Sequence, residues 1–278
     1  MTDLNSIIAI VHDMNRESGK IVRKYYGTGL FVETKADSSP VTRADREVEL
    51  YLREQIERHF PDHSIIGEEF GETRKSSAYR WVIDPIDGTQ SFLLRTPLFG
   101  TLLALECDGV PVLGSVYFPI QDQLLLGSDE TGTFYEGKRC FVSGTAEPRC
   151  AKLVITDPTH LLRGPFAGAL GNLCRIVSVV RGFGDCYGYF LVACGAADIM
   201  IDPFGVKRHD LAAIQPILEG AGGRLTSLNG FSDLDAGNAI ATNSKLHAQI
   251  LRILNPELAD NLDLIPDRDL QNRSRRAR

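Results

Sequence analysis

The sequence lacks any uninterrupted apolar stretch of the roughly 20 residues that span a bilayer. Its first 20 residues mix Asp3, Asp13, Arg16 and Glu17 with apolar positions, so they lack the continuous apolar segment of a secretory signal peptide. These absences exclude a membrane-spanning protein and predict a cytoplasmic location.

Cysteine is also sparse and badly placed for zinc. The six cysteines are scattered along the chain, with no C-x-x-C pair and no histidine at zinc-finger spacing. We therefore expect buried, reduced thiols.

Basic surface is scarce as well, because the net charge is -6 and the pI is near 5.6. That balance argues against a nucleic-acid partner and favours a small, soluble substrate. The exception is the polar tail 267–278, whose closing arginines predict a solvated, mobile segment.

Two kinds of hydrophobic pattern are present. Apolar residues recur at helical spacing from Leu4 to Tyr25 and again after Thr42, where Thr42 and Asp45 have the spacing of a capping box. Short apolar runs separated by Gly and Pro then predict strands at 64–67, 81–84, 101–105, 110–118, 123–126, 153–156 and 198–202, with helices at 187–194 and from about Asp210. This mixture predicts an α+β protein of stacked helix and sheet layers, although periodicity does not identify the topology.

The segment Asp84-Pro85-Ile86-Asp87-Gly88-Thr89 carries the strongest chemical signal. Pro85 cannot donate a ladder hydrogen bond, so we expect the strand 81–84 to end at Asp84. Gly88 then allows a turn, and Thr89 opens a short helix. Two carboxylates and free N–H groups would converge there, which suits a divalent cation and a phosphate. An ordinary Asx turn explains the same residues equally well.

Three other acidic positions have similar local alternatives. Glu68 and Glu69 follow the predicted strand 64–67. Asp210 stands at the start of a predicted helix, where an N-cap is the simpler interpretation. Asp45 also has a local explanation, because its spacing from Thr42 fits a capping box at the start of a helix.

Taken in order, Asp45, Gly67-Glu68-Glu69, Asp84 to Thr89, and Asp210 before Glu219-Gly220-Ala221-Gly222-Gly223 resemble the inositol monophosphatase family of metal-dependent, lithium-sensitive phosphatases. The resemblance implies a five-layered αβαβα sandwich. We accordingly expect one phosphatase unit over 1–266, built of two packed halves at about 1–145 and 146–266.

The resemblance also implies the site. The metal ligands would be the side chains of Glu68, Asp84, Asp87 and Asp210 and the carbonyl of Ile86. Four carboxylates about 4 Å apart repel by roughly 4 kcal/mol per pair at an effective dielectric of 20, which two divalent cations would cancel. The family pattern implies two or three Mg²⁺ ions, with Mn²⁺ as a substitute and Li⁺ as an inhibitor, and a homodimer.

In the implied reaction a metal-activated water attacks the phosphorus atom of a phosphate monoester. Thr89 and Asp45 would orient and deprotonate this water, with Glu68 assisting. The backbone N–H groups of Gly88 and Thr89 would hold the phosphate.

The segment from Arg181 to Tyr189 resembles the histidinol-phosphate phosphatase branch of the family. Asp185 could pair with the amine or imidazolium of histidinol, and Arg181 and Asp202 are further candidates for substrate contacts. The chain departs from the family at His209, where Trp is usual, and we expect the imidazole to fill part of that space. Two alternatives stay open: an inositol-1-monophosphatase or broad sugar-phosphate phosphatase, and a non-catalytic binding protein on the same fold.

Overall fold

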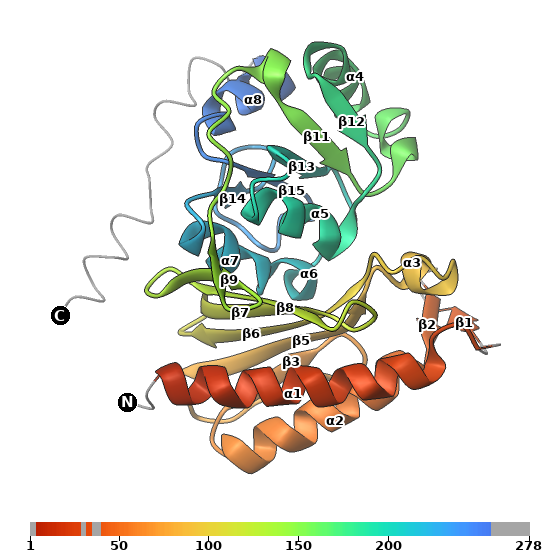
Figure 1. The fold of residues 1–278 in the computed structure, drawn as a ribbon, viewed down its shortest axis with the longest axis vertical. Coiled ribbons are helices and arrows are strands. Elements are labelled where there is room, and N and C mark those ends of the chain that lie inside the picture. The colour runs from red at the N-terminus through yellow and green to blue at the C-terminus, as the bar shows by residue number, and fades with distance from the viewer. Residues whose placement is uncertain (1–3, 29–31, 35–39, 257–278) are drawn as a thin grey trace.

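Two β-sheets alternate with three layers of helices in the structure (Figure 1). The structure is a computed structural model that describes residues 4–28, 32–34 and 40–256, so the predicted tail 267–278 lies outside the described residues. The order of layers is α1 and α2, the larger sheet, α5 to α7, the smaller sheet, and α4 with α8. The predicted αβαβα sandwich is confirmed.

The first layer is formed by α1 (Leu4–Tyr25) and α2 (Arg43–His59), as their apolar spacing predicts. Along the chain, the two helices are separated by a short antiparallel pair of strands, β1 (Val32–Thr34) and β2 (Pro40–Thr42). The predicted capping box begins α2, because Thr42 accepts from the Ala44 N–H and Asp45 accepts from the Thr42 N–H. Both helices pack their apolar faces on one face of the larger sheet.

The larger sheet has eight strands in the order β10-β9-β8-β7-β6-β5-β3-β4. Only β3 and β5 pair in parallel, and the other neighbours are antiparallel. The strands are β3 (Ser64–Gly67), β4 (Gly71–Thr73), β5 (Tyr79–Asp87), β6 (Gly100–Cys107), β7 (Val110–Phe118), β8 (Gln123–Ser128), β9 (Gly132–Tyr135) and β10 (Lys138–Cys140).

The prediction that the strand ends at Asp84 is wrong, because β5 continues through Pro85 to Asp87. Asp84 pairs with Leu102 and Asp87 pairs with Gly100, so the register shifts between them. This irregularity places Pro85 where no ladder N–H is needed. The Pro85 carbonyl accepts a hydrogen bond of 2.8 Å from the Thr101 hydroxyl. The helix α3 (Thr89–Leu93) then follows the Gly88 turn, as expected.

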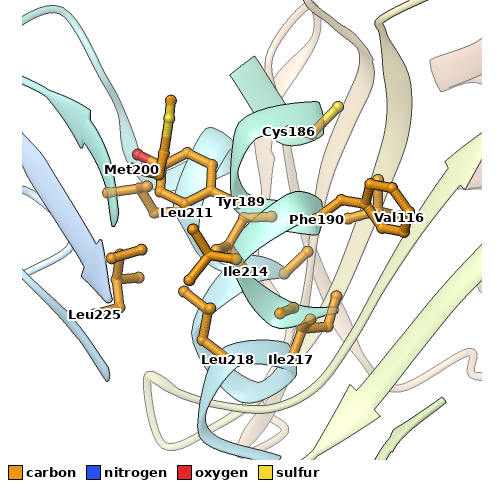
Figure 2. Packing of buried hydrophobic residues seen from close by; sticks show 14 of the residues in the cluster. Val116, Cys186, Tyr189, Phe190, Met200, Leu211, Ile214, Ile217, Leu218 and Leu225 are labelled. Carbon is orange, nitrogen blue, oxygen red and sulfur yellow. The ribbon is translucent and has the colours of Figure 1, made fainter. Parts of the chain in front are cut away.

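The middle layer comprises α5 (Asp185–Ala193), α6 (Arg208–Leu211) and α7 (Ile214–Gly220). Figure 2 shows Phe190 of this layer beside Val116 of the larger sheet, whereas Leu225 of the smaller sheet lies on the opposite side, nearer to Ile214 and Leu218. A continuous apolar core therefore joins the two sheets, and it fixes the ends of α5 and α6 against the end of β5.

The smaller sheet has five strands in the order β12-β11-β13-β15-β14, and its outer face is covered by α4 (Ala167–Ile176) and α8 (His247–Leu254). Two 3₁₀ turns cover Pro148–Cys150 and Pro158–Leu161. The strands are β11 (Lys152–Ile155), β12 (Val179–Arg181), β13 (Ile199–Asp202), β14 (Arg224–Thr226) and β15 (Ala239–Thr242).

All six cysteines are free thiols, as expected, but only Cys186 is buried and Cys150 is exposed. Within the described ranges 4–28, 32–34 and 40–256, no helix is both long and apolar enough to cross a membrane.

Candidate metal and phosphate site

The acidic residues singled out in the sequence meet at the end of β5, beside the first residues of α5 and α6 in the middle layer. Oxygen atoms of Asp84, Asp87 and Asp210 all lie within 4.8 Å of one another. A second group with the same spacing combines Glu68, Asp84 and the imidazole of His209. All four side chains predicted to bind metal are thus brought together, and Asp84 belongs to both groups.

Asp84 is the buried centre of this cluster. It is 2% exposed, and its Oδ1 atom has no hydrogen-bond partner. Burial and the nearby carboxylates of Glu68, Asp87 and Asp210 raise the pKa of Asp84 well above its ordinary value. A buried carboxylate needs a counter-charge, and carboxylate oxygens are the ligands that Mg²⁺ and other hard divalent cations take. The donor set and the unpartnered oxygen therefore fit a divalent cation.

Asp87 is held from the opposite half of the molecule. The Cys186 N–H, in the first turn of α5, donates a hydrogen bond of 2.5 Å to Asp87 Oδ2. Burial, followed by the charges of Asp185 and Asp210, nevertheless raises the pKa of Asp87 well above its ordinary range. Burial and repulsion among these acids thus outweigh the hydrogen bonding from Cys186.

The turn that carries Glu68 is fixed by Glu49, a fully buried residue of α2. Glu49 accepts hydrogen bonds from the Glu69 N–H at 2.7 Å and the Phe70 N–H at 3.2 Å, and it pairs with Arg53 at 2.8 Å. Gly67 is needed here because a Cβ atom would lie 1.9 Å from Glu49 Oε1. Sequence reasoning missed Glu49, although a charge between Val48 and Leu52 on the apolar face was a signal.

The helix that carries Asp210 is joined to the larger sheet by a chain of ion pairs that we call the Glu106 clamp, formed by Arg80, Glu106, Arg208 and Asp235. Glu106 is fully buried on β6, and its Oε2 atom accepts from Arg80 Nε at 2.8 Å and from Nη2 at 2.6 Å. Its Oε1 atom accepts from Arg208 Nη1 at 2.8 Å. Arg208 also pairs with Asp235 through Nε at 3.1 Å and Nη2 at 2.5 Å.

The clamp matters because α6 follows an irregular loop, 203–207, and has only four residues. Arg208 is the first of them and Asp210 the third. Within this turn the Lys207 N–H donates to Asp210 Oδ2 at 2.6 Å, which leaves Oδ1 directed to the cluster. The N-cap interpretation of Asp210 and its predicted role as a metal ligand are therefore compatible, because Oδ2 accepts from the backbone and Oδ1 is left for a cation. Sequence reasoning missed Glu106, which lies at the end of the apolar run 102–105.

The phosphate-binding residues predicted from sequence begin α3. Gly88 has φ = 86°, a conformation that favours glycine, and Thr89 starts the helix. The Thr89 hydroxyl donates to the Ile86 carbonyl at 3.1 Å. Asp45 accepts from the Thr42 hydroxyl at 2.6 Å, and burial raises the pKa of Asp45 to about 6. The proposed joint action of Thr89 and Asp45 on water stays a prediction.

A cavity of about 220 Å³ opens beside the cluster. Four acidic residues line this cavity. Asp87 and Asp210 belong to the carboxylate cluster, and Asp185 and Asp202 are predicted substrate residues. Burial and then repulsion by Asp202 and Asp210 raise the pKa of Asp185 to about 7. Burial raises the pKa of Asp202 to about 6, although Tyr189 donates to this carboxylate at 2.7 Å.

Asp185 is held in an uncommon backbone conformation, with φ = 52°. The Thr156 hydroxyl accepts a hydrogen bond of 3.0 Å from its N–H. A second cavity, of about 530 Å³, adjoins at Asp185 and is lined by Gly88, Thr89 and Phe183. Arg181 lines neither of these two cavities. Its side chain is exposed, and its guanidinium donates a hydrogen bond to the Val180 carbonyl. The structure thus brings Asp185 and Asp202 to the site but not Arg181.

Another cavity of about 530 Å³ lies between α1 and strands β8 and β9, lined by Ile8, His12, Leu124 and Phe134 among others. It is mostly apolar. Both groups of metal-ligating side chains found among the described residues lie elsewhere, so the cluster around Asp84 is the candidate site.

Comparison with known proteins identifies the family of the chain. The model of the Inositol monophosphatase family matches residues 3–259. A protein named histidinol-phosphatase from Chlorobaculum parvum is 38% identical over 239 residues, covering 83% of this chain and 92% of the relative. Another of that name, from Mycobacterium tuberculosis, is 38% identical over 231 residues, covering 81% and 88%. The crystal structure of the extragenic suppressor protein suhB from Bartonella henselae superposes with a TM-score of 0.84 at 28% identity, covering 90% of this chain and 98% of suhB.

Proposed function

Since the chain belongs to the inositol monophosphatase family and is a phosphatase of that family, we propose that it hydrolyses L-histidinol phosphate to L-histidinol and phosphate with the help of Mg²⁺. The observation that supports this substrate most is the pair of carboxylates formed by the partly buried Asp185 and the buried Asp202, in the same cavity as Asp87 and Asp210. The two relatives that carry the name histidinol-phosphatase support it independently.

The cation would be held by Glu68, Asp84, Asp87 and Asp210 together with the Ile86 carbonyl. When bound, a divalent cation supplies Lewis-acid chemistry, because it lowers the pKa of water and offsets negative charge on the phosphate. Mg²⁺ fits oxygen ligands of this kind, with Mn²⁺ as its substitute.

The chain's own residues orient the reactants. Gly88 and Thr89, at the start of α3, line the cavity next to the cluster, and their N–H groups would donate to phosphate oxygens. Thr89 and Asp45 would position the attacking water, with Asp45 taking its proton, and Glu68 would assist from the cation site. The raised pKa of Asp45, about 6, makes this carboxylate a better proton acceptor than an ordinary Asp.

The alcohol part of the substrate would lie against Asp185 and Asp202. Burial raises the pKa values of these two acids, and a cationic ligand would stabilise their charged forms. Histidinol carries an amine and an imidazole, whereas inositol offers hydroxyl groups alone. Phe204, which is 40% exposed and lines the same cavity, offers an apolar ring against which an imidazole can pack.

A second candidate, hydrolysis of inositol 1-phosphate or other sugar phosphates, is favoured by the adjoining cavity. Thr89, Ser91, Thr96 and Thr156 line it with hydroxyl groups that suit a polyol. The carboxylates gathered around the unpartnered Asp84 oxygen favour the phosphatase over the non-catalytic alternative, which a measurement of metal binding decides.

The test compares phosphate release from L-histidinol phosphate and from inositol 1-phosphate by the wild type, Asp185→Asn and Asp87→Asn. We expect the wild type to prefer histidinol phosphate. Asp185→Asn should raise KM for that substrate about 10- to 100-fold, the worth of a charge-assisted hydrogen bond, and leave inositol 1-phosphate nearly unchanged. Asp87→Asn should abolish both activities.

Asp233→Asn, at an exposed acid that lines neither cavity of the site, is the matched control and should behave as the wild type. A wild-type preference for inositol 1-phosphate, or full activity of Asp185→Asn on histidinol phosphate, would contradict the proposed substrate. Calorimetry that detects no Mg²⁺ or Mn²⁺ binding would contradict the phosphatase mechanism itself.

A further inference from the structure

His209 does more than fill the space where the family usually has Trp. Its Nε2 atom lies 3.5 Å from Asp210 Oδ1 and 3.8 Å from Glu68 Oε1. The side chains of all three residues are largely buried, with exposures of 17%, 20% and 16% for His209, Asp210 and Glu68. The imidazole nitrogen is therefore directed at two of the carboxylates that form the cation site.

These two separations are too long for hydrogen bonds, whose nitrogen-to-oxygen distances are about 2.7–3.2 Å. They are close to the spacing between two donors on one cation. With metal–nitrogen and metal–oxygen bonds of about 2.0–2.2 Å, neighbouring donors lie about 3.0–3.5 Å apart. Small movements of the Glu68 and His209 side chains would bring the observed distances into this range.

The third donor is Asp84. Atoms of Glu68, Asp84 and His209 all lie within 4.8 Å of one another. Asp84 Oδ1 is buried and has no hydrogen-bond partner, which is the independent sign that a positively charged ligand is missing beside it. Two oxygens and one nitrogen therefore converge on one side of the cluster, while Asp84, Asp87 and Asp210 offer oxygens alone on the other side.

We infer that Glu68, Asp84 and His209 form a mixed oxygen and nitrogen site that binds a first-row transition-metal dication in preference to Mg²⁺. Mg²⁺ is a hard cation that takes oxygen ligands and retains water, whereas imidazole is a good ligand for Zn²⁺, Fe²⁺ and Ni²⁺. The second group of three carboxylates remains suited to Mg²⁺. This inference rests on the proposed function only in placing a cation at the cluster.

Direct detection of the nitrogen ligand tests it. The full-length protein, freed of metal with a chelator, is loaded with Mn²⁺ until both groups are saturated, and electron spin echo modulation reports coupling between the Mn²⁺ electrons and nitrogen. We expect a nitrogen coupling in the wild type that is lost in both His209→Phe and His209→Gln. His12→Phe, which removes an imidazole on α1 far from the cluster, is the matched control and should keep the coupling.

Calorimetry supplies the second readout. Both His209 variants should lose about tenfold or more in Mn²⁺ affinity, since even partners outside the ligand shell are worth 10- to 100-fold, while Mg²⁺ affinity changes little. Absence of nitrogen coupling in the wild type, or equal losses for Mn²⁺ and Mg²⁺, would overturn the inference. Circular dichroism of the variants separates these outcomes from misfolding. Phosphate release is measured apart, so nitrogen coupling in a protein that does not hydrolyse histidinol phosphate would refute the substrate proposal alone.

Discussion

Replacing Arg208 by Gln tests whether the Glu106 clamp positions a metal ligand. The hydrogen bond to Glu106 joins a fully buried carboxylate to a guanidinium whose side chain is 24% exposed, and such charge-assisted bonds contribute about 1.5–3 kcal/mol. The pair with Asp235 is worth about 0–1 kcal/mol because the Asp235 side chain is 60% exposed. Arg208→Gln should therefore lower the free energy of unfolding by about 2–4 kcal/mol.

For a chain of this size that loss corresponds to a fall in Tm of about 5–10 °C, which thermal unfolding monitored by circular dichroism would measure. The functional effect should be separate. Because α6 follows an irregular loop, release of Arg208 frees Asp210, and we expect 10- to 100-fold weaker Mg²⁺ binding by calorimetry, as for other residues that orient metal ligands. Arg208→Lys should recover part of the affinity because it keeps the charge.

Two controls define the comparison. Asp235→Asn removes only the exposed half of the clamp and should cost less than about 1 kcal/mol. Arg74→Gln breaks an ion pair of an 82% exposed arginine with Glu72, away from α6, and should leave Mg²⁺ affinity unchanged. If Arg208→Gln lowers stability but leaves the affinity at the wild-type value, the clamp supports the fold and does not position Asp210. If it matches Arg74→Gln in both measurements, the reasoning fails altogether.

Two further predictions concern pH and packing. The pKa values of Asp45 and Asp202, about 6, and of Asp185, about 7, lie above the ordinary 3.8, so in a chelator the folded protein holds more protons than the unfolded chain between about pH 4 and 7. Its free energy of unfolding, measured with urea, should fall as pH rises through this window, and added Mg²⁺ should weaken the trend. A free energy of unfolding that rises with pH in the chelator would count against these pKa directions. Gly184→Ala should destabilise the protein by about 1–3 kcal/mol, because the added Cβ atom would lie 1.9 Å from the Thr156 backbone. Gly182→Ala, where the nearest neighbour of the added Cβ atom lies at 3.5 Å, should have little effect in the same denaturation assay. Equal effects of the two substitutions would refute the packing argument.

The elements with long, regular patterns could be predicted from the sequence. Both α1 and α2 and the central strands β3, β6, β7 and β8 lie where the apolar spacing indicated. The edge strands β10, β12 and β14 were missed, because each has only three residues and too few positions to show a period of two. Pro85 misled the prediction for β5, since local rules do not reveal a register shift opposite β6. The order of layers came from the family resemblance.

The site was predicted to a similar depth. The four acidic ligands followed from motif and resemblance, and the structure brings them together. Their supports did not follow, because Glu106 meets Arg208 across 102 positions of sequence, and no local pattern names such a partner. His209 was expected to occupy space, which stays a prediction, and the structure adds that its imidazole faces Glu68 and Asp210. The homodimer, the cytoplasmic location and the boundary near residue 145 stay predictions.

The hydrogen bond from the Cys186 N–H to Asp87 has a consequence for how the protein matures. It joins residues 99 positions apart, and it forms only when α5 of the second half has docked on the end of β5. Because contacts between distant residues close late in folding, the cluster should be among the last parts of the molecule to be completed. A nascent chain released before α5 would present Glu68, Asp84 and Asp87 without Asp210. Cation binding by the complete cluster should therefore appear only after both halves of the chain have folded and docked.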